Sequence, residues 1–269
     1  MRILRVFPER TSYTPDDDLV AIGHPGLFLP QADEVHVSIA FTWDIPLGNR
    51  LAVAWAKYYP IVKLGGPAFA SPCDEFTSGM YVRPGITFTS RGCPRRCPWC
   101  FVPKREGELR EIPDFPAGNW IADNNLLACP DRHVRKVLEM LEGQYEIQFP
   151  GGLDVRYLKD WHVAALKTLR VEQLFLGYDS PDVPILSAID RLRMAGFTQR
   201  QVRVYILVGF GTDTPEQAEK RLQFTFDAGA LPFPMRYRDE NGRYVVDRAY
   251  HALVRKWSRP AAVFATEQK

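Results

Sequence analysis

The chain has 269 residues, with 34 basic and 32 acidic side chains and a formal net charge of +2. Hydrophobic residues make up 46% and charged residues 25% of the sequence, a composition that is typical of folded globular proteins and argues against long disorder. No stretch approaches the roughly 18 consecutive apolar residues of a membrane span, and the N-terminus lacks the apolar run of a signal peptide. We therefore expect a cytoplasmic protein without a membrane partner.

Residues 1–80 predict a small α/β segment that is punctuated by proline and glycine. The partial alternation over 34–41 indicates a half-buried strand, and the apolar spacing over 47–58 indicates a helix. A short strand over 61–64 then runs into a Gly-Gly-Pro turn. Strand, helix and strand in close succession form a βαβ unit with parallel pairing, so we expect a Rossmann-like N-terminal segment.

From residue 85 onwards, strand patterns alternate with helical or long connecting segments. The six expected strands cover 86–89, 120–122, 145–149, 171–176, 202–208 and 231–237. One expected helix begins at Asp131, and three more cover 158–169, 185–192 and 215–226. We expect the third strand to break at Pro150-Gly151-Gly152, and the prolines of the last strand favour a sheet edge.

This alternation predicts an α/β fold, a (β/α)6 partial TIM barrel that is two units short of eight. The expected domains are the N-terminal segment (1–80), the partial barrel (81–238) and a C-terminal helical extension (239–269). In such parallel arrays the active site lies at the carboxyl ends of the strands. Polar and glycine-rich segments follow several of the expected strands, which places a candidate site there.

Cysteine spacing gives the most specific chemical signal. The five cysteines are Cys73, Cys93, Cys97, Cys100 and Cys129, and the middle three form a C-x3-C-x2-C motif. An odd number with this clustering favours metal ligation in a reducing compartment over a disulfide framework. Three thiolates in one loop can ligate three irons of a [4Fe–4S] cluster and leave the fourth iron open to a small molecule.

A structural zinc site is the alternative interpretation of the same cysteines. Cys129 and His133 form a C-x3-H pair that could complete such a site with the motif. The protein would then be a non-catalytic zinc- or cluster-stabilised module that binds nucleic acid. Outside that alternative, Cys129 is either a packed thiol or, because it follows the second expected strand, a catalytic candidate, whereas Cys73 is expected to be structural or incidental.

The motif, with Trp99 directly before its last cysteine, resembles that of the radical S-adenosylmethionine (SAM) superfamily. In that superfamily the cysteines follow the first strand of a (β/α)6 partial barrel. Four further segments resemble the strand ends of its branch that often carries a cobalamin-binding domain: Asp123-Asn124-Asn125, 152–158, 175–180 and 205–216. The resemblance covers residues 85 to about 235.

The resemblance implies that Cys93, Cys97 and Cys100 hold a [4Fe–4S] cluster whose open iron takes the amino and carboxylate groups of SAM. It implies reductive cleavage of SAM to a 5′-deoxyadenosyl radical, which abstracts hydrogen from a substrate, and a flavodoxin- or ferredoxin-type electron donor. The SAM-binding residues that follow from it are Trp99, Asp123, Asn124, Asn125, Arg156, Asp179, Ser180 and Gly209. For two of these a plainer role is also open: Trp99 as packing, and Asp179 as a helix cap.

Residues 62–67 resemble the last strand of that cobalamin domain, so the N-terminal segment looks like a shortened form of it. The Asp-x-His-x-x-Gly loop that would supply the cobalt ligand is absent, since neither His24 nor His36 lies in such a context. We therefore do not expect cobalamin.

Charge is unevenly distributed along the chain. Residues 91–110 hold six basic against two acidic side chains, and residues 236–259 hold seven against three, so each segment carries +4. Both segments leave expected strands at the same end of the array. They indicate either two solvated faces or a basic rim for an anionic substrate, nucleic acid and nucleotides among them.

Overall fold

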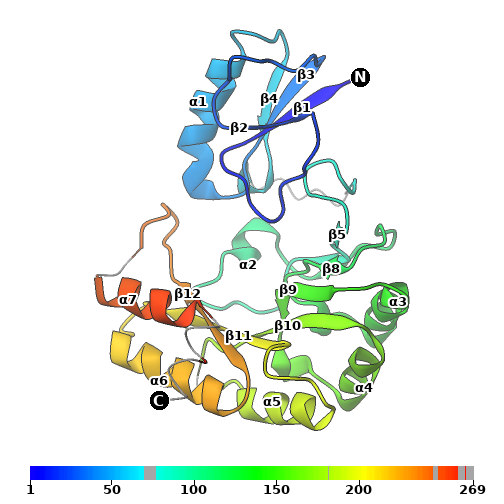
Figure 1. Ribbon diagram of the computed structural model, residues 1–269, viewed down its shortest axis with the longest axis vertical. Helices are drawn as coiled ribbons and strands as arrows, with labels where there is room; N and C mark the ends of the chain where they lie inside the picture. The colour runs from blue at the N-terminus through cyan, green and yellow to red at the C-terminus, as the bar shows by residue number, and fades with distance from the viewer. Residues whose placement is uncertain (70–76, 181, 245–247, 260–263, 265–269) are drawn as a thin grey trace.

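Two parallel β-sheets, one above the other in Figure 1, organise the chain. The computed structural model describes residues 1–69, 77–180, 182–244, 248–259 and 264. We call residues 3–69 the N-terminal unit and residues 86–257 the main unit. Among the described residues, no helix combines the length and apolarity of a bilayer span.

The N-terminal unit is a four-stranded parallel sheet with one covering α-helix. Across the sheet, the strands are β2 (Val20–Ile22), β1 (Ile3–Phe7), β3 (Glu34–Ser38) and β4 (Val62–Gly65). A 3-10 turn (Thr42–Asp44) and helix α1 (Ile45–Trp55) connect β3 to β4, which confirms the predicted βαβ unit. Pro46 lies in the first turn of α1, where a backbone N–H would have no helical partner.

Strands β1 and β2 were not predicted, and Arg5 explains why β1 was missed. Arg5 interrupts the apolar run of β1, yet it is buried in the folded chain. Its guanidinium pairs with Asp17 and donates to the carbonyls of Gly79 and Met80 at 3.2 and 3.0 Å. A buried charge is tolerated when it is paired and hydrogen-bonded, and these partners are distant in sequence.

The main unit contains a six-stranded parallel sheet whose strands follow one another in chain order. They are β5 (Ile86–Thr87), β8 (Trp120–Ile121), β9 (Ile147–Leu153), β10 (Val171–Gly177), β11 (Val202–Val208) and β12 (Leu231–Arg236). The helices are α3 (Asp131–Leu141), α4 (Asp160–Thr168), α5 (Ile185–Met194), α6 (Pro215–Asp227) and α7 (Arg248–Trp257). The position of β12 at one edge agrees with its prolines.

The side chains of β11 alternate between the two faces of the sheet, and one of these faces the core. Val202, Val204, Ile206 and Val208 are fully buried, while the residues between them face the other way. The buried set packs with the apolar sides of the helices into one core. Helix α7 contributes Tyr250, Leu253 and Trp257 to that core, so the described part of residues 239–269 shares the packing of the main unit.

Strand β9 differs from its expected form. It continues through Pro150-Gly151-Gly152, where we expected a break. Its pairing with β10 is irregular there, which lets the strand absorb these residues. Gly151 also packs against the backbone that follows β8: a Cβ on it would lie 2.0 Å from the carbonyl oxygen of Asp123.

A small antiparallel hairpin, which was not predicted, carries the cysteine motif. Its first strand, β6 (Ser90–Arg91), follows β5, and its second strand is β7 (Arg110–Glu111). The loop with the three cysteines and the short helix α2 (Val102–Arg105) lie between them. In Figure 1, α2 lies between the two units. The hairpin therefore holds the motif at the junction of the units.

Acid sensitivity is expected from His162, at the start of α4. Its Nδ1 accepts the backbone N–H of Lys159 at 3.0 Å, and burial lowers the pKa of the ring to about 4. The unfolded residue takes up a proton near pH 6.5, so stability is full above that pH and falls as the pH drops towards 4, by about 3 kcal/mol. Urea unfolding at pH 7 and 4.5 should show a smaller loss for His162→Gln than for wild type. The exposed His24→Gln should match wild type, and an unchanged loss in His162→Gln would refute the assignment.

Candidate metal and cofactor site

A cavity of about 1480 Å³ lies between the two units and contains the predicted site. Its walls include Gly65 and Gly66 at the end of β4, and Gly177 and Asp179 at the end of β10. Carboxyl ends of parallel strands are where ligands bind in α/β folds, because no side-chain layer covers them. Both sheets thus present their ligand-binding ends to one space.

The three motif cysteines line this cavity together. All three are half-buried free thiols. Local backbone geometry shapes the loop: the N–H of Cys100 donates to the carbonyl of Cys97 at 3.0 Å, and that of Cys93 donates to the carbonyl of Gly107 at 3.3 Å. Gly92 has a φ of 75°, and a Cβ there would lie 2.1 Å from the carbonyl oxygen of Glu108, so only glycine fits.

The Cys100 thiol lies in a partly buried environment with negative groups nearby. Burial raises the pKa of Cys100, and the negative charges of Cys97, Cys93 and Asp179 raise it further. Thiolates that repel one another in this way gain most from a cation that replaces their protons. The Asn125 amide donates to Cys93 Sγ at 3.5 Å.

The donor set fits an iron–sulfur cluster. Among the described residues, no three His, Cys, Asp or Glu side chains converge as ligands of a single metal ion. A [4Fe–4S] cluster makes a different demand, because each thiolate binds its own iron and the thiols need only surround one space. Three cysteines around one cavity meet that demand.

Cys129 and His133 lie elsewhere and do not join the motif in a zinc site. Neither lines the cavity. His133 Nε2 lies 3.2 Å from Thr89 Oγ1 and its Nδ1 lies 3.3 Å from Glu111. Burial raises the pKa of Cys129 to about 11, against the effect of a hydrogen bond with Ser90, so this thiol stays protonated at neutral pH. This placement favours a packed thiol, and Cys73 lies outside the described residues.

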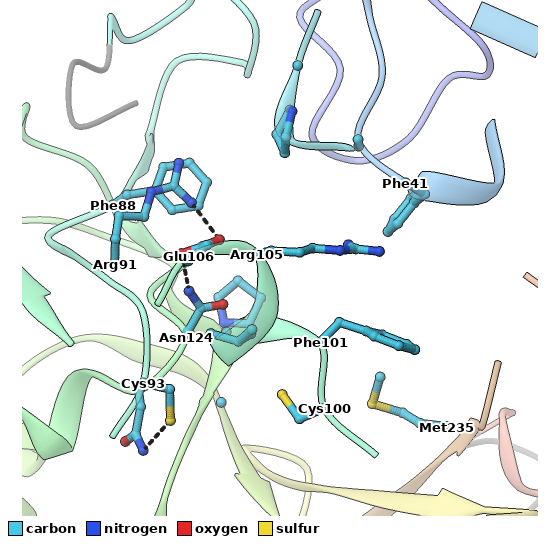
Figure 2. Close-up of a pocket in the computed structure, with 18 of the residues that line it drawn as sticks. Phe41, Phe88, Arg91, Cys93, Cys100, Phe101, Arg105, Glu106, Asn124 and Met235 are labelled. Carbon is cyan, nitrogen blue, oxygen red and sulfur yellow. Dashed lines mark hydrogen bonds and ion pairs between the residues drawn. The ribbon is translucent and has the colours of Figure 1, made fainter. Parts of the chain in front are cut away.

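Asn124 and Asn125 follow β8 and line the cavity as expected. Asn124 Nδ2 donates to Glu106 Oε2 at 2.6 Å (Figure 2), and the same oxygen accepts the N–H of Gly92 at 3.1 Å. Asn125 Nδ2 also donates to Asp154 at 3.3 Å, while its buried Oδ1 has no hydrogen-bond partner among the described residues. An unpaired buried acceptor beside a cysteine is a position where a ligand donor would be stabilised.

Two further predicted residues, Arg156 and Asp179, reach the cavity from β9 and β10. The guanidinium of Arg156 forms a two-pronged pair with Asp154, at 2.7 and 3.0 Å. Burial raises the pKa of Asp179, although the nearby Leu207 backbone, Arg156 and Trp99 oppose the shift in part. Trp99 itself lines the cavity and packs edge-on against Phe210, with ring centres 5.6 Å apart.

Three predicted SAM-binding residues do not line the cavity: Asp123, Ser180 and Gly209. Asp123 is buried and accepts hydrogen bonds from Thr89 and Ser90, on the opposite side of the strand end from Asn124. Ser180 donates to Asp182 within its own loop. Gly209 donates its N–H to Asp213 at 2.8 Å, which organises the turn before α6.

Glu106 and Tyr205 belong to the site but were not identified from sequence. Glu106 pairs with Arg91 and accepts hydrogen bonds from Gly92 and Asn124. Its position as an acidic residue within a basic segment is the feature of the sequence that could have identified it. The hydroxyl of Tyr205 donates to the carbonyl of Pro150 at 2.9 Å, which fixes the ring in the cavity wall. Its position in an apolar strand pattern gave no sign of this role.

Comparisons with known proteins were informative only at the level of structure. No protein-family model and no curated protein matches the chain. The fold is similar to that of the radical S-adenosylmethionine methyltransferase TsrM from Kitasatospora setae, solved with cobalamin and a [4Fe–4S] cluster. The TM-score is 0.56 at 10% identity, over 77% of this chain and 65% of that one.

The same enzyme solved with tryptophan substrate and the SAM analogue aza-SAM gives a TM-score of 0.55 at 10% identity, over 77% and 62% of the two chains. Coproporphyrinogen III oxidase from Escherichia coli, described as a radical SAM enzyme, gives 0.36 at 15% identity, over 54% and 37%. The chain thus spans 65% of the length of the first of these TsrM structures. At this level of similarity, the chain shares the α/β fold of a radical SAM methyltransferase.

Proposed function

We propose that this chain is a radical SAM enzyme that binds a [4Fe–4S] cluster through Cys93, Cys97 and Cys100. The observation that carries the proposal is that the three motif cysteines line one cavity at the carboxyl end of a parallel sheet, in a fold similar to TsrM. Within this proposal the six-stranded sheet is a (β/α)6 partial barrel. The electron comes from a low-potential donor of the flavodoxin or ferredoxin type, in the cytoplasm.

A bound cluster would supply one electron to SAM, whose C5′–S bond then breaks to give methionine and a 5′-deoxyadenosyl radical that takes a hydrogen atom from the substrate. The three thiolates hold the iron. The Asn125 amide donates to Cys93 Sγ and withdraws charge from it, which is one way a protein tunes such a centre. The unpartnered Oδ1 of Asn125 accepts a hydrogen bond from the ammonium group of SAM in this assignment.

The remaining polar side chains orient SAM within the same cavity. Arg156 is held in place by Asp154, and its outer N–H groups are suited to the SAM carboxylate. Trp99 and Asp179, which both line the cavity, form the wall assigned to the adenosine moiety. Each group is fixed by a second partner, so little rearrangement is needed when SAM binds.

Cobalamin is not part of the proposal. His36, which lines the cavity from β3, is engaged at both ring nitrogens: Nδ1 lies 2.5 Å from Tyr81 Oη and Nε2 lies 2.9 Å from Glu34. His24 is exposed in the loop after β2. Neither histidine presents a free nitrogen to the cavity from a loop at the strand ends.

Reductive cleavage of SAM tests the proposal. Anaerobic reconstitution with iron and sulfide, followed by SAM and dithionite, should produce 5′-deoxyadenosine on chromatography, and omission of dithionite should produce none. Asn125→Ala should weaken SAM binding by about tenfold in calorimetry, because one hydrogen bond to a charged group is lost, while iron content stays unchanged. The exposed Asn241→Ala is the matched control. A fully iron-loaded protein that yields no 5′-deoxyadenosine would contradict the proposal.

A further inference from the structure

The cavity extends well beyond the cysteines to a mouth formed by both units. We use the name arginine–aromatic rim for Phe41, Phe101, Arg105, Arg236 and Arg238, all of which line this cavity. They come from the segment after β3, from the cysteine loop with α2, and from the end of β12 and the residues after it. None of them was assigned above to the cluster or to SAM.

Within the described part of the chain, no carboxylate forms an ion pair with a rim arginine. Their polar partners carry no negative charge: Arg105 donates to Thr42 Oγ1 at 3.0 Å, Arg236 contacts His251 at 3.0 Å, and Arg238 donates to the Tyr244 hydroxyl. Elsewhere in the cavity, Arg91 pairs with Glu106, Arg156 with Asp154 and Lys63 with Glu34. The rim therefore holds positive charge that is available to a ligand.

The acidic groups at this end do not cancel that charge. Glu9 lines the cavity and Asp44 lies near Arg238, but neither forms an ion pair with a rim arginine among the described residues. Burial raises the pKa of Asp44, and the nearby Glu9 raises it further. Over the whole described lining, eight Lys and Arg side chains face four Asp and Glu side chains. The described lining thus carries a net positive formal charge, which favours an anionic ligand.

Aromatic rings lie beside two of the rim arginines and provide stacking surfaces. Figure 2 shows Arg105 extended between Phe41 of the N-terminal unit and Phe101 of the main unit. The guanidinium of Arg105 lies 5.4 Å from the Phe101 ring centre, and that of Arg238 lies 4.9 Å from the centre of Trp43. Phe41 stacks on Trp43 at 4.6 Å, with an angle of 7° between the rings, yet remains 40% exposed.

A ligand with both an anionic oxygen fork and a planar ring matches this combination. Planar guanidinium groups bind phosphate through paired N–H donors, and exposed aromatic faces stack on nucleobases. We propose that the arginine–aromatic rim binds the substrate and selects a nucleoside 5′-phosphate unit, either free or within a strand. The assignment of this unit as the substrate rests on the proposed function, whereas its binding does not.

Equilibrium binding to the wild-type protein tests this proposal without iron loading or reductant. The probes are GMP and UMP, the nucleosides guanosine and uridine, and a short single-stranded RNA. The monophosphates are expected to bind at least about tenfold more tightly than the nucleosides, and added KCl should weaken the binding of the monophosphates. The reason is that only the phosphate engages the unpaired arginines.

Variants locate the binding. Arg105→Gln and Arg236→Gln should each weaken GMP binding by about tenfold, whereas Arg10→Gln, which makes the same charge change at an exposed residue paired with Asp16, should leave it unchanged. Phe41→Leu should weaken GMP but not inorganic phosphate. Thermal unfolding of each variant establishes that it is folded, and Arg105→Lys, which keeps the charge, should lose less affinity than Arg105→Gln.

The outcomes separate the two proposals. RNA that binds more than tenfold tighter than GMP identifies a strand as the source of the unit, and equal binding identifies the free nucleotide. Monophosphates that bind no better than nucleosides, rim variants that bind like wild type, or displacement of GMP by S-adenosylhomocysteine would overturn the rim assignment. If the rim assignment fails but 5′-deoxyadenosine is produced, the proposed radical chemistry is still supported. If GMP binds tightly but no 5′-deoxyadenosine is produced, the rim assignment is still supported.

Discussion

Alanine at any one of Cys93, Cys97 and Cys100 is expected to abolish iron loading, from about four irons per chain to near zero. The three thiols line one cavity, and each must ligate one iron of the cluster. With only two protein ligands left, the cluster has too few anchors to survive removal of free iron. Iron and sulfide analysis after anaerobic reconstitution and desalting measures the effect, together with the visible absorbance of the cluster.

Cys129→Ala is the matched control for this experiment. It makes the same chemical change in the same chain, but Cys129 is buried outside the cavity. Iron content should remain near that of wild type in this variant. A Cys97→Ala protein that retained its full iron content, or a Cys129→Ala protein that lost it, would refute the assignment of ligands.

Periodicity in the sequence was sufficient for the long elements. The apolar alternation over 202–208 and the helical pattern over 215–226 predicted β11 and α6 closely, since both elements obey local rules. Thr214 and Gln217 form a capping box at the start of α6. Six parallel strands in chain order followed from the same alternation of patterns.

Short elements were beyond this reasoning because tertiary contacts define them. The strands β6 and β7 have two residues each, which is too few for a periodic signal. The hairpin of β6 and β7 joins residues about twenty positions apart, around a loop whose course depends on Gly92. A sequence pattern carries no information on such a close backbone approach.

Residues that line the cavity could be predicted where the end of a strand alone determines their position. Asn124, Asn125, Arg156 and Asp179 follow parallel strands and reach the cavity. Asp123 was grouped with its neighbours but faces the other side, because successive residues of an extended chain point in opposite directions. Which side is the cavity side depends on the partners of Asp123, which are Thr89 just before β6 and Ser90 at its start, and these were not predictable.

Those partners make Asp123 a structural support for the cysteine loop. Its carboxylate accepts the N–H of Thr89 and the Thr89 hydroxyl, both at 2.6 Å, and the Ser90 hydroxyl at 2.7 Å. Burial raises the pKa of Asp123, and these donors oppose the shift. Ser90 begins the hairpin that carries Cys93, so the carboxylate ties the end of β8 to the base of the motif.

Asp123→Ala is therefore expected to lower the free energy of unfolding by about 3 kcal/mol, because it leaves up to three donors buried without their acceptor. Asp123→Asn, which keeps one acceptor oxygen for the Thr89 N–H, should lose roughly 1 kcal/mol. Asp160→Ala, which removes an exposed carboxylate paired with Arg191, should cost less than about 1 kcal/mol. Urea unfolding measures all three. Iron loss after reconstitution should follow the same order, because a loosened hairpin no longer holds the cysteines around one space. If Asp123→Ala were as stable as Asp160→Ala, or kept its full iron content despite the lost stability, Asp123 would not be the support of the cysteine loop.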